Sequence, residues 1–286
     1  MPYYRRRRQP RLNYRLKKAV LNASTFKKRD TMINCSNLTS TGPSTSYVNG
    51  PAVIQSQTST DIGINHPVVL LWCATARDLT DASGNPGIRE NEAARTSTTP
   101  YMKGLSEKIE IQTSSGTPWQ WRRICFTYKG TLPGSATTTT FSLFRENNTG
   151  YGRMLNSVAG NRNQGATYDL FYLIFAGQNA SDWMDPMTAK LDRNRISVKY
   201  DKICTIAAGT SDGVIRKYSR YHPMEKTLVY DDDESGEKES TSYLSTQGMS
   251  GMGDYYVIDL IRSRFGAPSS DALLFGSTAT LYWHEK

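Results

Sequence analysis

The side chains best suited to chemistry gather at the start of the chain, where arginines and lysines alternate with tyrosines. Residues 1–29 contain eleven Lys and Arg and no Asp or Glu, and the first carboxylate is Asp30. A guanidinium fork matches the geometry of phosphate oxygens, and an exposed tyrosine ring can stack on an unpaired base. This pattern predicts binding of single-stranded nucleic acid. The predicted contact residues are Tyr3, Tyr4, Tyr14, Arg5, Arg6, Arg7, Arg8, Arg11, Arg15, Lys17, Lys18, Lys27, Lys28 and Arg29.

The excess positive charge of the protein belongs to this segment. The whole chain has 35 Lys and Arg against 26 Asp and Glu, a net charge of +9. Without the eleven bases of residues 1–29, 24 bases face 26 acids, which is a net charge of −2. A basic tail on a near-neutral body is typical of a protein that holds a polyanion in one place. For a single strand, eleven cations predict a slope of log affinity against log salt no steeper than about −8.

The same segment fits a nuclear localisation signal. Arg5, Arg6, Arg7 and Arg8 are followed by Lys17 and Lys18 at bipartite-like spacing. The two interpretations are compatible, because one basic tail can bind an import receptor and nucleic acid. Like-charge repulsion and few apolar residues predict that the segment is disordered. We therefore predict an arm over residues 1–29 and one folded domain over residues 30–286, with no membrane-spanning segment.

Catalytic and metal-binding motifs give no signal in the folded part. The sequence has no recognisable nucleophile, zinc-protease or phosphate-loop motif. Glu107 and Glu110 could form the carboxylate pair of a glycosidase, although surface charge is the simpler interpretation. The cysteines are predicted to be buried, reduced thiols, because Cys73, Cys125 and Cys204 lie inside apolar strand-like runs. We expect no catalytic residue, no cofactor and no metal.

An acidic run at residues 231–239 (DDDESGEKE) has two interpretations. Asp231, Asp233 and Ser235 precede Gly236 at the offsets of an EF-hand calcium loop, but position twelve is Ser242 instead of the bidentate Glu. A solvated surface loop is the simpler interpretation.

The sequence pattern of residues 30–286 is typical of a β-rich protein. Turn residues such as ASGNPG and LPGSATT lie between runs of β-branched and aromatic residues. This pattern predicts an all-β sandwich or jelly roll of roughly eight to ten strands. Strands are predicted over residues 68–77, 105–113, 119–129, 140–146, 169–176, 195–208, 215–222, 226–230, 255–264 and 279–284.

The run PWQWRRICFTYKG at residues 118–130 resembles the W-x-W-R-R-aromatic strand of genomovirus capsid proteins, which are coat proteins of small circular single-stranded DNA viruses. The start MPYYRRRR, the run DLFYLIFAG and the C-terminal strand are also similar to that family, and the layout is distantly similar to geminivirus coat proteins. The resemblance implies a single eight-stranded jelly roll with a basic N-terminal arm. It further implies a T = 1 icosahedral shell around circular single-stranded DNA.

The partners implied by the resemblance are further copies of the chain, a single-stranded DNA genome and a host nuclear import receptor. The implied locations are the virion and the host nucleus. One alternative is a nuclear single-stranded-nucleic-acid-binding or shuttle protein without a shell. Another is a jelly-roll carbohydrate-active enzyme with an incidental basic tail.

Arg122 and Arg123 also have two interpretations. They lie between Trp119 and Trp121, which share one strand face, and Ile124 and Phe126, which share the other, so a β-bulge is predicted at the arginines. Either they are rim residues of a core strand, or they contact phosphate on the inner surface of a shell. In a shell, the acidic residues 231–239 should lie outside or at a subunit contact, because they would repel DNA.

Overall fold

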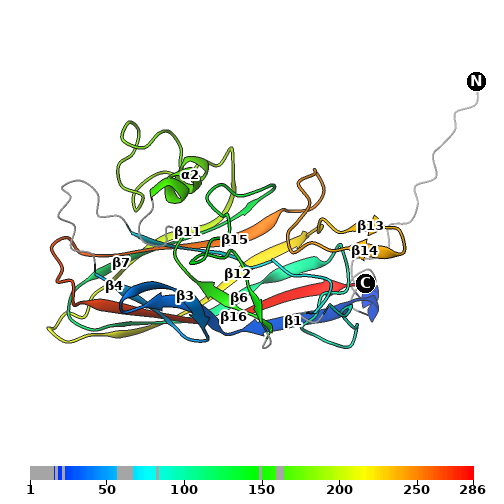
Figure 1. Cartoon of the computed structure of the whole chain (residues 1–286), viewed down its shortest axis with the longest axis horizontal. Coiled ribbons are helices and arrows are strands. Elements are labelled where there is room, and N and C mark those ends of the chain that lie inside the picture. The colour runs from blue at the N-terminus through cyan, green and yellow to red at the C-terminus, as the bar shows by residue number, and fades with distance from the viewer. Residues whose placement is uncertain are drawn as a thin grey trace, which may run out of the picture.

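Two large antiparallel sheets form the body of the protein (Figure 1). The computed structural model describes residues 23–56, 67–81, 84–147, 150–158 and 164–286, together with Leu16, Ala19 and Val20. The first sheet has the order β1 (Phe26–Met32), β16 (Ala272–Glu285), β6 (Tyr101–Thr113) and β12 (Ile215–Thr227), with β4 (Ala52–Gln55) also paired to β16. The second sheet has the order β11 (Ser197–Ile206), β7 (Trp119–Tyr128), β15 (Asp254–Ser263) and β5 (Val68–Cys73).

The order of the strands defines the topology as a jelly roll. The two large sheets contain, besides β4, the eight strands β1, β5, β6, β7, β11, β12, β15 and β16. Numbered in chain order, the first, eighth, third and sixth of these form the first sheet. The second sheet holds the fifth, fourth, seventh and second. This is the arrangement of two interlocked Greek keys, so the predicted all-β, eight-stranded jelly roll is confirmed.

Apolar side chains from both sheets fill the space between them. Every second residue of β16 is buried, as a strand with one covered face requires. One cluster gathers around Trp72, Leu105 and Trp283, and a second around Trp121 and Phe275.

A helix covers the outer face of the second sheet (Figure 1). This helix, α2 (Gln164–Ile174), contains most of the run for which the sequence predicts a strand, so that prediction is wrong. Leu170, Phe171 and Ile174 are buried whereas Tyr172 is 46% exposed, which is the spacing of a helix face. A continuous apolar run suits a buried strand and a buried helix equally, so its periodicity could not separate them.

Because α2 and its neighbouring loops cover that sheet, β7 is buried on both faces. Trp119 and Trp121 point toward the first sheet, whereas Ile124 and Phe126 point toward α2. The tryptophans and the Ile124–Phe126 pair are therefore both buried on a regularly alternating strand, one pair on each face. The bulge predicted at the arginines is absent from the pairing of β7 with β15, which keeps one register along its whole length.

The other strands lie outside the two large sheets. One sheet has the order β10 (Arg153–Leu155), β2 (Asn34–Thr39) and β3 (Gly42–Val48). Two hairpins pair β8 (Glu146–Asn147) with β9 (Gly150–Tyr151), and β13 (Asp233–Ser235) with β14 (Lys238–Ser240). All four cysteines are unpaired, and three of them are buried as predicted, while Cys204 is half-buried. No helix within the described ranges is long and apolar enough to cross a membrane.

The folded domain begins earlier than predicted. Residues 26–29 belong to β1, which pairs with β16 from Phe26 opposite Glu285 to Met32 opposite Ala279. The predicted boundary at residue 30 is therefore corrected to residue 26. The strand has no apolar alternation, because its inward-facing positions include Lys28 and Asp30 as well as Met32. Among the described residues before β1, Leu16, Ala19, Val20, Ala23 and Ser24 are helical, whereas the sequence predicts disorder for all of residues 1–29.

Candidate nucleic-acid interface

Most of the predicted nucleic-acid contacts lie outside the described residues, so their roles in nucleic-acid binding and nuclear import remain predictions. They are Tyr3, Tyr4, Tyr14, Arg5, Arg6, Arg7, Arg8, Arg11, Arg15, Lys17 and Lys18.

Lys28 lies inside the domain, which corrects its predicted role. Its ammonium donates hydrogen bonds to the carbonyl oxygens of Asn91 at 2.9 Å and Ala94 at 3.0 Å and lies 3.9 Å from a Glu285 oxygen. Burial lowers its pKa, although the charge of Glu285 opposes this effect. A lysine held in this way cannot reach phosphate while the domain is folded. Lys27 and Arg29 are exposed on the opposite side of the strand.

Arg122 and Arg123 are also buried, so their predicted contact with phosphate is corrected. Arg122 points toward the α2 side, where it donates to both oxygens of Asp201 at 2.9 and 2.8 Å and to the Pro186 carbonyl oxygen at 2.7 Å. Arg123 points between the sheets, and its side chain is 2% exposed. Neither guanidinium has a surface position from which to bind a polyanion.

Arg123 belongs to a buried cluster of four charges that separates the two apolar clusters between the sheets. It contacts Glu107 at 2.5 Å and Asp259 at 2.7 Å, and Arg153 contacts the same carboxylates at 3.1 and 2.9 Å. The Trp121 indole also donates to Asp259 at 2.7 Å. Burial disfavours the charged form of Glu107, but the two arginines outweigh it and lower its pKa. The cluster balances two positive and two negative charges inside the sandwich.

The positions of Glu107 and Glu110 on β6 rule them out as the carboxylate pair of a glycosidase. Glu107 points into the buried cluster, whereas Glu110 lies on the other face of β6, 3.3 Å from the ammonium of Lys217. Two carboxylates on opposite faces of a strand cannot act on one glycosidic bond.

His222 borders the cluster, with its Nε2 atom 4.0 Å from Glu107, and we expect it to make stability depend on pH. Burial, followed by the charge of Arg123, lowers its pKa from 6.5 to about 4. Between pH 6.5 and pH 4 the imidazole binds a proton in the unfolded chain but not in the folded protein. The free energy of unfolding therefore falls as the pH drops through this range. Relative to His222→Gln, the native protein should lose on the order of 3 kcal/mol between pH 6.5 and 4. Urea unfolding of both proteins across this range measures the difference, and parallel pH profiles would contradict it.

The outer face of the first sheet gathers exposed aromatic and cationic side chains, and we call it the aromatic–basic face. Its rings are Tyr101, Tyr221 and Tyr282, which are 38%, 54% and 36% exposed, together with half-buried His284. Its cations are Lys27, Arg29, Lys103, Lys108 and Lys217. No helix among the residues that the structure describes lies over this sheet, in contrast to the α2-covered sheet opposite (Figure 1).

Strand register brings these groups together from distant parts of the sequence. Lys27, His284 and Tyr101 form one row across β1, β16 and β6. The Tyr101 hydroxyl donates to Glu225 at 2.9 Å, and the Lys103 ammonium donates to the other oxygen of that carboxylate at 2.5 Å. Burial lowers the pKa of His284, and the charges of Lys103 and Lys27 lower it further. The charge of Glu225 has the opposite effect on this pKa.

Gly104 leaves room for the side chain of Tyr221 on the neighbouring strand β12. A Cβ atom at this glycine would be 2.7 Å from the Tyr221 hydroxyl oxygen, so a larger residue would displace the ring. The hydroxyl instead donates to the Lys103 carbonyl oxygen at 3.3 Å.

The chemistry available on this face is stacking with weak electrostatic attraction. Exposed rings can stack on unpaired bases, and β-sheets that bind RNA use their aromatic residues in this way. Arg29 and Lys103 are paired with carboxylates, whereas Lys27 and Lys108 have no carboxylate partner within the described ranges. The sequence contains a signal for the face, because Tyr282 and His284 alternate with buried Leu281 and Trp283. By itself this alternation predicts only a strand with one exposed side.

Comparisons with known proteins add little to this geometry. No family model matches the chain, and the search of curated proteins found no match. Among solved structures, it matches an unassembled VP1 pentamer of the Washington University polyomavirus, in a mutant form. That match has 9% sequence identity, covers 92% of this chain and 94% of the other, and has a TM-score of 0.12. This TM-score is too low to support a common fold. The strand order by itself defines the chain as an all-β jelly roll, and one of its sheets has the uncovered aromatic–basic face.

Proposed function

We propose that this chain is a structural capsid subunit of the genomovirus kind, which assembles into a small T = 1 icosahedral shell and packages circular single-stranded DNA through its basic arm. A jelly roll alone does not determine a function. The observation that carries the proposal is the junction between arm and domain. The cationic segment leads into β1, whose outward Lys27 and Arg29 stand on the same sheet face as Tyr282 and His284.

The proposal includes the partners and locations expected of such a subunit. Copies of the chain form the shell, single-stranded DNA is the cargo, and a host import receptor recognises the arm. The protein then occurs in the virion and in the host nucleus. Its role is structural and does not require catalysis.

The second candidate is a nuclear single-stranded-nucleic-acid-binding protein that forms no shell. The aromatic–basic face supports both candidates, since stacking on bases does not require assembly. Negative-stain electron microscopy of the purified full-length protein separates them. Uniform closed particles support the capsid proposal, whereas monomers at high concentration with DNA present would leave the second candidate.

Replacing tyrosines of the aromatic–basic face should weaken binding without changing its salt dependence. We expect Tyr221→Leu with Tyr282→Leu to cost about 1–3 kcal/mol for each stacked base lost, because stacking is removed while every charge remains. Fluorescence anisotropy with a single-stranded oligonucleotide at several salt concentrations measures both quantities.

Tyr172→Leu is the matched control, because this tyrosine is also exposed, at 46%, but lies on α2 on the other side of the molecule. Its affinity should equal that of the unmodified protein. Equal losses in the control and the double variant would show that the sheet face has no special role.

A further inference from the structure

A second basic surface lies where the two sheets meet at one open side. β11 and β12 are the edge strands of their sheets, and each exposes cationic side chains along its length. We call this surface the basic edge, and it comprises Lys199, Lys202, Arg216, Arg220 and Lys226.

The cations of the basic edge lack carboxylate partners within the described part of the chain. The nearby acids are engaged elsewhere, since Asp201 binds Arg122 and Glu225 binds Lys103. The Nε atom of Arg220 is buried without a hydrogen-bond acceptor. Burial lowers the pKa of Lys199, and the charge of Lys226 lowers it further. The cations of the basic edge therefore repel one another, and no carboxylate of the described part of the same subunit neutralises them. An anionic partner would remove this repulsion.

The acidic residues 231–239 form a rigidly anchored hairpin, which we call the acidic hairpin. The two strands β13 and β14 are fully exposed, and Glu234 stands directly opposite Glu239, a like-charge pair that destabilises the isolated hairpin. Glu237 lies in the turn between them. The run therefore forms two paired strands, Asp233–Ser235 and Lys238–Ser240, where an EF-hand would have a continuous loop.

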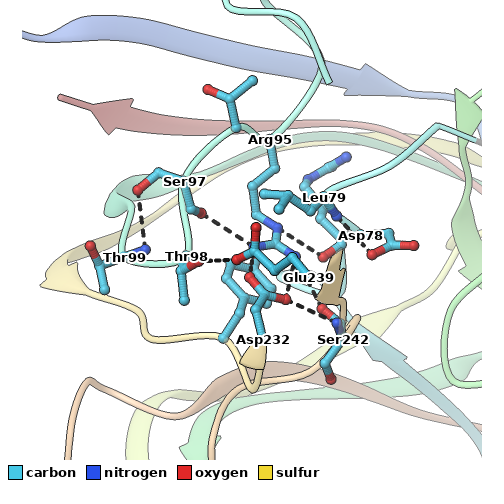
Figure 2. A network of polar contacts seen from close by, with 12 residues as sticks. Asp78, Leu79, Arg95, Ser97, Thr98, Thr99, Asp232, Glu239 and Ser242 are labelled. Atoms are coloured by element: carbon cyan, nitrogen blue, oxygen red, sulfur yellow. Dashed lines mark hydrogen bonds and ion pairs between the residues drawn. The ribbon is translucent and has the colours of Figure 1, made fainter. Parts of the chain in front are cut away.

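Arg95 fixes the base of this hairpin, as Figure 2 shows. Its guanidinium donates to both oxygens of Asp232, at 2.5 and 3.1 Å, and to the Ser242 carbonyl oxygen at 3.1 Å. Both side chains of the Arg95–Asp232 pair are almost completely buried. Thr98 also donates to Glu239 at 3.4 Å. The hairpin is therefore presented in a defined position, with Asp231, Asp233, Glu234 and Glu237 directed outward.

We propose that the acidic hairpin of one copy docks on the basic edge of a second copy. The inference rests on the proposed self-assembly and names one contact within it. Five exposed carboxylates with one lysine meet five cations, and each surface relieves repulsion in the other. A one-way contact between two different surfaces is head-to-tail, and it closes into a ring when the rotation between successive copies closes.

Charge reversal on each side, and then on both, tests the contact. Glu234→Lys with Glu237→Lys, or Lys202→Glu with Lys226→Glu, should raise the concentration needed for assembly at least tenfold. Combining all four substitutions restores opposite charges and should return assembly to within about threefold of the unmodified protein. Lys190→Glu, which reverses an exposed lysine outside both surfaces, is the matched control. Light scattering and sedimentation without DNA measure assembly, and circular dichroism checks folding.

The outcomes distinguish this contact from the proposed function. If the unmodified chain does not assemble, the capsid proposal fails. If it assembles and both reversed variants assemble equally well, the contact alone is overturned, and the lysines only block edge-to-edge strand pairing. Particles that form normally but take up less DNA would also overturn it, by assigning the basic edge to nucleic acid. Failure of the four-fold variant to recover, with its fold intact, would contradict the pairing of the two surfaces.

Discussion

Removing residues 1–22 should abolish most of the salt-dependent affinity for single-stranded DNA. This deletion takes away eight cations, Arg5, Arg6, Arg7, Arg8, Arg11, Arg15, Lys17 and Lys18, and leaves β1 intact. At about −0.7 per neutralised phosphate, eight cations give a slope no steeper than about −6. This replaces the value expected from eleven cations, because Lys28 is buried and Lys27 and Arg29 remain with the sheet.

The effect should be large and should depend on salt. With a slope near −6, raising salt from about 50 to 200 mM weakens binding by the intact protein by roughly three orders of magnitude. The shortened chain has 27 bases against 26 acids and should keep only a shallow slope from its surface patches. Circular dichroism should show an unchanged fold. A shortened protein that keeps the full slope would move the main contact from the arm to the jelly roll.

Replacing Arg123 should be among the most destabilising single changes in the domain. Arg123→Met leaves Glu107 and Asp259 buried with one arginine between them, and breaking a buried ion pair in this way costs about 3–5 kcal/mol. Arg29→Met is the matched control, because the Arg29–Glu92 pair is 65% and 63% exposed. Such a surface pair contributes about 0–1 kcal/mol. Urea unfolding measures both variants.

A compensated variant keeps this prediction testable even if Arg123→Met does not fold. Arg123→Met with Asp259→Asn removes one charge of each sign, so the pair should cost clearly less than the sum of the two single changes. Arg153→Met offers an independent single change in the same cluster. Costs near 1 kcal/mol for both arginine variants would show that the buried charges do not hold the sandwich together.

The sequence predicted the fold class well because strand periodicity and turn chemistry are local signals. β6, β7, β15 and β16 all fall within or around predicted runs. The helix α2 was missed because its run is apolar on nearly every side, and β1 because its inward positions include the charged residues Lys28 and Asp30. In both cases the partner surface decides the structure, and that surface comes from residues far away in the sequence.

The site was predicted less well, for the same reason. Composition identified a basic segment, but it could not separate exposed Lys27 and Arg29 from Lys28, which points inward between them. Adjacent Arg122 and Arg123 looked like a surface pair, yet each is paired with carboxylates from other strands. The aromatic–basic face combines side chains from four strands, and only the sheet register brings them together.

The most direct test of the account is co-assembly of the full-length protein with circular single-stranded DNA, followed by nuclease treatment and sedimentation. We expect the DNA to co-sediment with uniform closed particles and to resist nuclease. The protein lacking residues 1–22 should protect far less DNA under the same conditions. DNA that stays bound but fully sensitive to nuclease, with no closed particles in the pellet, would contradict the proposal that this jelly roll is a capsid subunit.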